Sequence, residues 1–343
     1  MKYKLLGRSG LRVSQLCLGA MSMGEEWGFG ANEEDSYKVF KAFTDNGGNF
    51  IDTANRYTEG TSEKYIGKFI AGMRNSTVLA TKYTLYTERG NPNDGGNHKK
   101  NMIQSLEGSL KRLNTDYVDV LYLHAWDFTT SVEEVLRGLD DLVRAGKVLY
   151  IAISDTPAWI ISKANTIADF RGWSPFVAVQ LEYSLITRDA ERELIPMAKE
   201  LDLAVTAWGP LAGGALTGKY LNSDGTPKRL KEGSKRLNEK SIAITKVVVD
   251  IANEIGCTAT HVALAWHNGQ SQQIFPIVGA RTEQQILDTI GSLNVTLSTE
   301  QMNRLNEVSK IEYGFPNDFL TGDVVKNVVY GGMFEKIENH RLK

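Results

Sequence analysis

The sequence predicts an α/β protein whose strands close into a (β/α)8 TIM barrel. Three observations indicate this fold class. Eight short apolar runs recur along the chain, an amphipathic stretch follows each of them, and the runs are apolar at consecutive positions instead of alternating. Consecutive apolar positions are typical of parallel strands covered on both faces, and strands that alternate with helices favour a parallel sheet. A doubly wound sheet is the structural alternative.

The apolar runs and the patterns between them predict the elements in chain order. The eight predicted strands are Gln15–Leu18, Asn49–Asp52, Val78–Lys82, Val118–His124, Val148–Ser154, Val177–Glu182, Ala204–Trp208 and Ile274–Val278. Apolar residues at helical spacing predict helices over Glu34–Asn46, Asn101–Leu113 and Val132–Ala145. After the second strand, Thr61 or Ser62 followed by Glu63 resembles a capping signal that opens another helix.

Three segments lie outside this alternation. Tyr3–Leu6 and Leu11–Val13 flank a Gly-Arg-Ser-Gly turn and predict a small hairpin that plugs the barrel floor. Ala212–Asn238 is too long for an ordinary connection and indicates a functional loop. The tail, residues 311–343, has no clear period and is expected to be a loop plus a helix, or partly disordered. We therefore expect one domain over residues 1–343, with a core over about 14–310.

Composition argues against several classes of function. The 39 basic and 41 acidic side chains leave a net charge of −2, which steers the protein toward neither nucleic acid nor a membrane surface. The chain lacks an apolar run long enough to span a bilayer and a secretory signal at its start. Cys17 and Cys257 lack metal-site spacing, so we expect small core residues, no metal and a cytoplasmic protein. The sequence carries no signal for oligomeric state.

Four ionisable residues follow neighbouring strands of the predicted barrel. Asp52 ends the second strand, Lys82 the third and His124 the fourth, while Tyr57 lies in the loop after the second strand. In this fold the active site lies at the carboxyl ends of the strands, where these side chains meet. A tyrosine has a pKa of roughly 10, and an ammonium beside it lowers that value.

These four residues suggest a division of roles. Lys82 would supply the charge, Asp52 would hold Lys82, His124 would orient a substrate oxygen, and Tyr57 would protonate that oxygen. The sequence lacks a nucleophile elbow and a phosphate-binding P-loop. An acid without a protein nucleophile fits reduction of a carbonyl by an external hydride.

The motifs around these four residues resemble those of aldo-keto reductases. The resemblance is carried by Phe50–Glu63, Ala80–Tyr83 and Leu121–His124, in this order, and it extends from Leu5 to about Leu305. Within that family, the sequence most resembles the bacterial-type NADP-dependent oxidoreductases, which are similar to the branch of channel β-subunit-like proteins. It implies a barrel enzyme that reduces a carbonyl with NADPH, in which the four residues form a catalytic tetrad and Tyr57 is the proton donor.

The resemblance also implies a set of contacts to the nicotinamide and the pyrophosphate. The residues concerned are Gly19, Ala20, Met21, Asp52, Ser154, Asp155, Gln180, Trp208, Gly209, Pro210, Leu211, Gly213 and Lys219. Asp155 stands where the family usually has Asn, and a carboxylate accepts hydrogen bonds but cannot donate to a carboxamide oxygen. Ser184 likewise replaces a more common Asn. The charge run Lys228–Arg236 is either a solvated stretch or a clamp over the cofactor.

The adenosine half is assigned to a segment after the last strand. Its residues are Gly279, Arg281, Gln285, Asp288 and Thr289, the last of which replaces a frequent Asn. The segment opens a predicted helix, whose N-terminus attracts anions, and Arg281 is suited to a bidentate pair with a 2′-phosphate. We therefore expect NADP(H) in preference to NAD(H). No Gly-x-Gly-x-x-Gly motif follows a strand, which argues against a Rossmann domain.

The expected substrate is a small-molecule carbonyl compound or sugar. Trp27, Tyr86 and Trp126 fall in loops after strands one, three and four, where they would line a pocket together with Tyr57 and His124. Packing of the loops themselves is the alternative for these rings. Two other functions remain open, namely a regulatory module that binds the cofactor with little turnover, and a barrel isomerase or lyase that uses Asp52 and His124.

Overall fold

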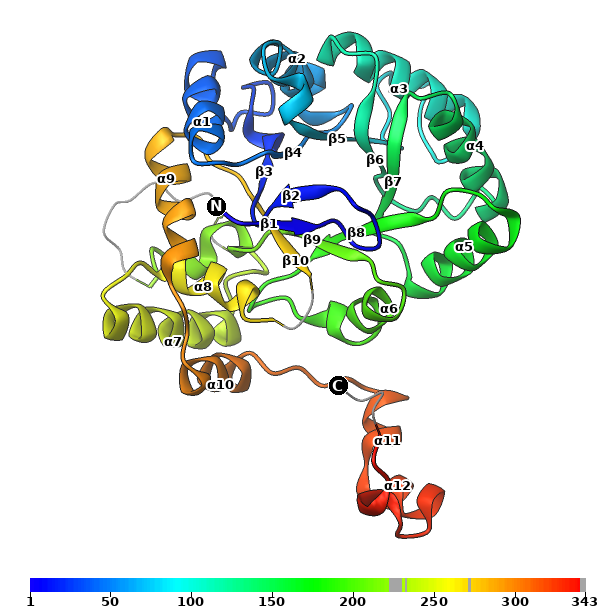
Figure 1. The fold of residues 1–343 in the computed structure, drawn as a ribbon. Coiled ribbons are helices and arrows are strands. Elements are labelled where there is room, and N and C mark those ends of the chain that lie inside the picture. The colour runs from blue at the N-terminus through cyan, green and yellow to red at the C-terminus, as the bar shows by residue number, and fades with distance from the viewer. Residues whose placement is uncertain (222–229, 232, 271–272, 340–343) are drawn as a thin grey trace.

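The protein folds into a closed barrel of parallel strands surrounded by helices (Figure 1). The computed structural model describes residues 1–221, 230–231, 233–270 and 273–339. The barrel strands follow one another in the order β10-β3-β4-β5-β6-β7-β8-β9, so that the first and last strands of the wall pair and close it. The predicted (β/α)8 barrel is confirmed, and the doubly wound alternative is wrong.

The strands agree with the apolar runs to within two residues at most ends. The hairpin consists of β1 (Tyr3–Leu5) and β2 (Arg12–Ser14). The barrel consists of β3 (Cys17–Gly19), β4 (Phe50–Asp52), β5 (Val78–Tyr83), β6 (Val118–Leu123), β7 (Val148–Ser154), β8 (Phe176–Glu182), β9 (Ala204–Trp208) and β10 (Ile274–Val278). All but five of the residues in these barrel strands are buried, which explains why the runs do not alternate.

Helices cover the outer face of the barrel (Figure 1). They are α1 (Glu33–Asp45), α2 (Thr61–Phe69), α3 (Lys99–Leu113), α4 (Val132–Arg144), α5 (Ala158–Arg171), α6 (Leu194–Glu200), α7 (Glu239–Ile255), α8 (Ala259–Asn268), α9 (Glu283–Gly291) and α10 (Thr299–Val308). The three helices predicted by range are confirmed as α1, α3 and α4, with ends shifted by one or two residues. None of the helices in the described part of the chain is long and apolar enough to cross a membrane.

The hairpin closes the amino-terminal end of the barrel. β1 and β2 pair antiparallel, and Leu6 and Val13 are completely buried in one cluster with Phe50 and Phe275 from the barrel strands. Ser14 ties the hairpin to the barrel, because its backbone N–H donates to Asn49 Oδ1 at 2.7 Å. With its floor filled in this way, the barrel is open to a ligand only at the carboxyl ends of its strands.

The start of α2 corrects one local prediction. The N-cap residue of the helix is Gly60, with a left-handed φ of 88°, and it has no side chain to cap the helix, so that Thr58 Oγ1 instead accepts from the Ser62 backbone N–H at 3.1 Å. Thr61 instead donates to Glu26, and Ser62 Oγ donates to the Ala20 carbonyl at 2.8 Å. Tertiary partners have therefore taken the hydroxyl groups that the capping motif would use.

The tail forms two short helices beyond α10. They are α11 (Asn317–Thr321) and α12 (Asp323–Tyr330), followed by the 3-10 turn η7 (Phe334–Lys336). These elements stand apart from the barrel, below α10 in the view of Figure 1. The expectation of a loop plus a helix is thus correct in kind, but the described part of the tail, to residue 339, has two helices, and neither contains a buried residue.

Candidate active site

The sequence-predicted tetrad meets at the carboxyl ends of β4, β5 and β6. Asp52 is the last residue of β4, Lys82 is the penultimate residue of β5, and His124 follows directly after β6. Tyr57 opens the 3-10 turn η2 (Tyr57–Gly60) in the loop after β4. Because β4, β5 and β6 follow one another in the barrel, residues up to 72 positions apart in the chain gather at the same end of it.

Lys82 is the centre of this group. Its ammonium donates to Asp52 Oδ2 at 2.6 Å, to the Thr53 carbonyl at 2.9 Å and to the Tyr57 hydroxyl at 3.0 Å. The Lys82 side chain is completely buried and Asp52 nearly so. Three acceptors thus saturate the three N–H groups of the ammonium, which fixes its position beneath the tyrosine hydroxyl.

The electrostatics set the protonation state of each member. Burial lowers the pKa of Lys82, but Asp52 and Tyr57 more than offset this, so the pKa lies above its ordinary value. Burial raises the pKa of Tyr57, and the opposing effect of Lys82 is smaller. The sequence-based expectation that Lys82 would bring the tyrosine pKa down is therefore wrong in the net direction. At neutral pH the phenol is protonated, as a proton donor must be.

His124 completes the group as a neutral ring. Its imidazole lies edge-on to Tyr57, with the ring centroids 5.8 Å apart. Burial, and then the charge of Lys82, lowers the pKa of His124 to about 3. Its Nδ1 is buried and has no hydrogen-bond partner among the described residues. A neutral imidazole beside the phenol can donate one hydrogen bond to a substrate oxygen.

The loop that carries Tyr57 is held in a strained conformation. Thr58, Glu59 and Gly60 have left-handed φ values of 46°, 54° and 88°, and non-glycine residues adopt such angles at a cost of roughly 1–3 kcal/mol each. Thr58 Oγ1 offsets this cost by donating to the Met23 carbonyl at 2.7 Å. The sequence alone did not reveal this anchor, because the two residues are 35 positions apart.

Gln180 and Ser154 lie next to the tetrad on β8 and β7. The two residues are paired in register, and Gln180 Nε2 donates to Asp52 Oδ1 at 3.0 Å. Gln180 was expected only as a carboxamide ligand, so its bond to Asp52 is a second role that the sequence did not indicate. Ser154 Oγ is buried without a hydrogen-bond partner in the described part of the chain. That hydroxyl is therefore available to a ligand.

Asp155 and Trp208 are joined by a hydrogen bond. The Trp208 indole N–H donates to Asp155 Oδ1 at 3.1 Å, and Asp155 has a left-handed φ of 42°. Burial raises the pKa of Asp155, and this bond works against the rise. Trp208 is the last residue of β9, and its ring is half-buried. The Asp155 carboxylate, which stands where the resemblance leads one to expect an Asn amide, thus orients this ring.

Glycines and cations gather after β9. Gly213 and Gly214 have left-handed φ values of 69° and 92° within η5 (Ala212–Thr217). A side chain on Gly214 would approach Lys219 Nζ to 3.1 Å, so the lysine folds over this turn. Arg236 reaches back from the loop and donates to Glu182 Oε1 at 2.6 Å. Of the charge run Lys228–Arg236 that was proposed as a clamp, Lys228, Arg229 and Glu232 lie outside the described residues.

The segment after β10 lies beside the first strand of the barrel. Gly279 approaches the Gly19 carbonyl, where Gly19 itself has no room for a side chain because Ile277 packs against it. Arg281 and Gln285 are exposed at the start of α9, and the Arg281 backbone N–H donates to Gln285 Oε1 at 2.9 Å.

The other two residues expected at the adenosine half, Asp288 and Thr289, follow on α9. Asp288 Oδ1 lies 3.1 Å from His261 Nε2, and Thr289 is buried. All three of Gln285, Asp288 and Thr289 belong to α9, at positions i, i+3 and i+4, so they share one side of the helix.

The three aromatic residues predicted to line a substrate pocket lie in loops at the carboxyl end of the barrel, the end that holds Tyr57. Trp27 lies edge-on to Tyr57 at 6.2 Å between centroids, and its indole N–H donates to Glu59 Oε1 at 3.0 Å. The backbone N–H of Trp126 donates to the Asp155 carbonyl at 3.4 Å, which places Trp126 beside Asp155. Tyr86 is different, because the Arg56 guanidinium stacks on its ring at 4.6 Å.

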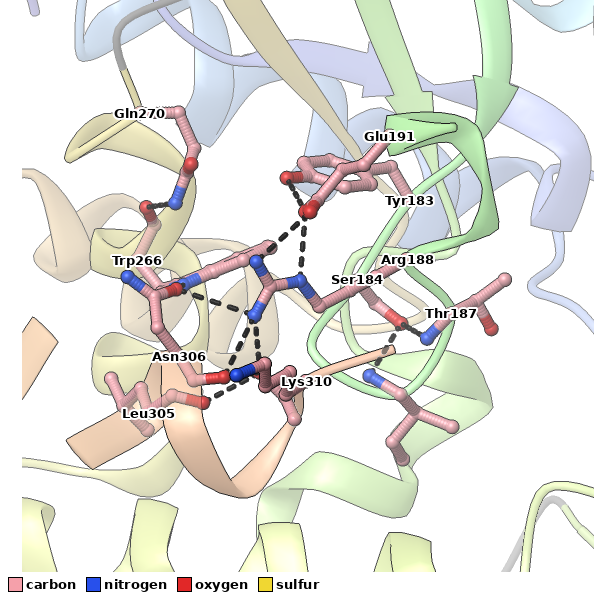
Figure 2. Close-up of polar contacts among 12 residues, drawn as sticks. Tyr183, Ser184, Thr187, Arg188, Glu191, Trp266, Gln270, Leu305, Asn306 and Lys310 are labelled. Carbon is pink, nitrogen blue, oxygen red and sulfur yellow. Dashed lines mark hydrogen bonds and ion pairs between the residues drawn. The ribbon is translucent and has the colours of Figure 1, made fainter. Parts of the chain in front are cut away.

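A second cluster of polar side chains, partly buried, follows the end of β8. Arg188 makes a bidentate pair with Glu191, at 2.7 and 3.0 Å, and its third nitrogen donates to Ser309 Oγ at 2.7 Å (Figure 2). Tyr183, directly after β8, donates to Glu191 Oε1 at 2.6 Å. This cluster joins the strand end next to the site to α10 and the base of the tail.

Comparison with known proteins agrees with this arrangement. The sequence model of the aldo/keto reductase family matches residues 15–310. The chain is 40% identical to aryl-alcohol dehydrogenase [NADP(+)] of Phanerodontia chrysosporium, over 90% of this chain and 85% of that protein. It is 39% identical to norsolorinic acid reductase stcV of Emericella nidulans, over 91% of this chain and 82% of that protein.

Proposed function

Because this chain belongs to the aldo/keto reductase family, we propose that it is an NADP(H)-dependent oxidoreductase that interconverts an aromatic aldehyde or ketone and the corresponding alcohol. One observation carries the proposal. A fully buried ammonium, Lys82, is held by Asp52 directly beneath the hydroxyl of a protonated Tyr57. This arrangement suits the delivery of a proton to an oxygen at the carboxyl end of the barrel.

Each residue has a distinct part in the reduction. NADPH, when bound, supplies the hydride that the carbonyl carbon accepts. Tyr57 donates its proton to the carbonyl oxygen, and Lys82 stabilises the phenolate that remains. Asp52 holds Lys82 and offsets the cost of burying its charge. His124, neutral because of its depressed pKa, donates a hydrogen bond to the same oxygen and orients it.

The residues around the tetrad fit a nicotinamide dinucleotide. Ser154 Oγ, a buried hydroxyl without a described partner, suits the carboxamide, and the Trp208 ring, oriented by Asp155, suits stacking against the nicotinamide. Lys219 over the turn at Gly214 suits the pyrophosphate. An exposed guanidinium at the start of α9 suits a 2′-phosphate.

The aromatic class of substrate rests on two independent supports. Two relatives are named for aryl alcohols and for norsolorinic acid. In this chain, the ring of Trp27 is fixed beside Tyr57 by Glu59, so that a flat, apolar surface borders the reacting position. Aromatic rings prefer such surfaces because edge-to-face and offset-stacked contacts add to the burial of apolar area.

A steady-state assay tests the proposal. The loss of NADPH absorbance is followed with benzaldehyde, a nitro-substituted benzaldehyde and an aliphatic aldehyde of similar size. We expect turnover of all three, with the higher kcat/KM for the aromatic pair. Cofactor binding without turnover of any carbonyl compound would instead favour a regulatory module. Absence of any fluorescence change on titration with NADPH would favour a lyase or isomerase.

Replacing Arg281 with alanine should weaken NADPH binding by roughly 10- to 100-fold, because a hydrogen bond to a charged group contributes roughly 1.5–3 kcal/mol. NADH lacks the 2′-phosphate, so its affinity should change little. Fluorescence titration with both cofactors measures the effect. Arg137→Ala, a change at an exposed arginine on α4, is the control. Equal losses for the two cofactors would contradict the assignment of Arg281 to the phosphate.

A further inference from the structure

A buried histidine lies against the turn that follows β9, residues 208–211, which we call the cofactor turn. His267, on α8, is 1% exposed, and its ring lies edge-on to the ring of Tyr183 at 5.4 Å between centroids. Neither of its ring nitrogens makes a well-formed hydrogen bond in the described part of the chain. Buried polar groups without such a partner are costly and rare in native proteins. The position of this imidazole therefore needs an explanation beyond the packing of α8.

The Pro210 carbonyl is the polar group that acts on this imidazole. Burial lowers the pKa of His267 to about 3, and the Pro210 carbonyl, as a hydrogen-bond acceptor, works against this shift. The ring is therefore neutral near pH 7, and a neutral imidazole carries one N–H donor. α8 also packs against η5, the element that continues the cofactor turn. An N–H of His267 and the carbonyl of Pro210 are thus a matched donor and acceptor.

A second carbonyl of the cofactor turn is held by Tyr183. The backbone N–H of Tyr183 donates to the Trp208 carbonyl at 3.3 Å. The hydroxyl of Tyr183 donates to Glu191, which Arg188 holds in a bidentate pair (Figure 2). Tyr183 is thus fixed at its backbone and at its hydroxyl, and the ring of His267 packs against the part between them.

The cofactor turn depends on such contacts because its backbone is strained. Gly209 has a left-handed φ of 67°, and Ala212, directly after the turn, has one of 49°. A non-glycine residue keeps such an angle only where the surrounding structure maintains it. Within the turn itself, the Gly209 carbonyl accepts from the Ala212 N–H at 2.7 Å. The carbonyls on either side of Gly209 are left to Tyr183 and His267.

The geometry of the peptide bond connects these carbonyls to a ligand. In a trans peptide the C=O and the N–H point in opposite directions, and both peptides concerned are trans. Because the carbonyl of Trp208 is fixed, the N–H of Gly209 points to the opposite side. The carbonyl of Pro210 directs the N–H of Leu211 in the same way. Neither N–H donates to another described residue, so both are available to a ligand.

We propose that His267 is a positioning residue for the cofactor. By holding the Pro210 carbonyl, and together with Tyr183, it sets the cofactor turn so that the ring of Trp208 and the free N–H groups meet the nicotinamide and the pyrophosphate. This inference rests on the proposed function, which assigns the turn to that half of the dinucleotide. His267 itself touches neither the cofactor nor the substrate.

Binding of two ligands to one variant gives the first test. His267→Phe keeps an aromatic ring beside Tyr183 but has no N–H for the Pro210 carbonyl. NADPH should bind roughly 5- to 50-fold more weakly, the range for a hydrogen bond whose loss leaves a buried acceptor unpaired. Adenosine 2′,5′-bisphosphate lacks the nicotinamide and the pyrophosphate, so its affinity should stay that of the wild type. Titration calorimetry measures both dissociation constants.

Val262→Ala is the control, because it removes buried side-chain volume from the same helix away from the cofactor turn. It should leave both affinities unchanged. If His267→Phe weakened the two ligands equally, the histidine would only stabilise the fold, and the proposal would be wrong. Unchanged NADPH affinity would also overturn it. A wild-type protein that does not bind NADPH would instead contradict the proposed function.

The wild-type protein without cofactor gives a second test, which does not depend on a folded His267→Phe variant. In protein labelled with nitrogen-15 at histidine, the signals of His267 are those absent from a His267→Gln spectrum. Near pH 7 they should show one fixed neutral tautomer, since the Pro210 carbonyl accepts from only one ring nitrogen. A mixture of both tautomers, or a protonated ring, would show that His267 does not hold this carbonyl.

Discussion

Tyr57→Phe should lower kcat for carbonyl reduction by roughly 10²- to 10⁴-fold, the usual contribution of a general acid. The phenylalanine ring keeps the edge-on contacts with Trp27 and His124. The substitution removes the hydroxyl that Lys82 contacts, and with it the phenolate that Lys82 would stabilise. Since the loss concerns proton delivery alone, the dissociation constant for NADPH should stay close to that of the wild type. Single-turnover rates and a fluorescence titration measure the two effects separately.

Tyr86→Phe serves as the matched control for this substitution. It removes another phenol from the same end of the barrel, one that bonds to Arg56 and lies beneath its guanidinium. We expect kcat to change little in this variant. If Tyr57→Phe and Tyr86→Phe lowered kcat by similar factors, or if Tyr57→Phe retained turnover, Tyr57 would not be the proton donor.

Lys82→Met should destabilise the fold by about 3–5 kcal/mol, the usual cost of breaking a buried ion pair from one side. Methionine fills much of the space, but it leaves the Asp52 carboxylate buried with only the Gln180 amide as a described side-chain partner. Turnover should fall as well, because no cation then stabilises the phenolate of Tyr57. Urea unfolding at neutral pH gives the change in the free energy of unfolding.

A double variant separates the ion pair from simple packing. Asp52→Asn combined with Lys82→Met removes both charges, so it should be more stable than the single Lys82→Met variant, although still inactive. Lys100→Met, at an exposed lysine in α3, should be close to neutral. A Lys82→Met variant that unfolds at the same urea concentration as Lys100→Met would show that the buried pair does not hold the site together.

Much of the candidate site was readable from the sequence because its four central residues depend on strand ends. Apolar runs predicted β4, β5 and β6, and parallel strands place their carboxyl ends at one edge. The positions of Asp52, Lys82 and His124 in the barrel then followed, since each lies within one residue of its strand end. Tyr57 could be placed beside them because it lies only five residues after Asp52, in the loop that follows β4.

Other features were decided by the tertiary structure alone. The pKa of Tyr57 shifts upward because its hydroxyl is desolvated, and desolvation depends on all the residues that pack around the ring. The bonds of Gln180 to Asp52 and of Trp208 to Asp155 join residues that are far apart in the chain and belong to no local motif. The hydroxyl groups of Thr61 and Ser62 found partners outside their own helix for the same reason.

The sequence by itself therefore determined the barrel, the edge at which the candidate site lies and the identity of the four residues gathered there, because hydrophobic periodicity is a local property of the chain. Only the tertiary structure decided the protonation state of the acid, the partners of the buried polar groups and the direction in which the tail leaves the barrel. These depend on distance and burial, and neither can be obtained from the spacing of residues along the chain.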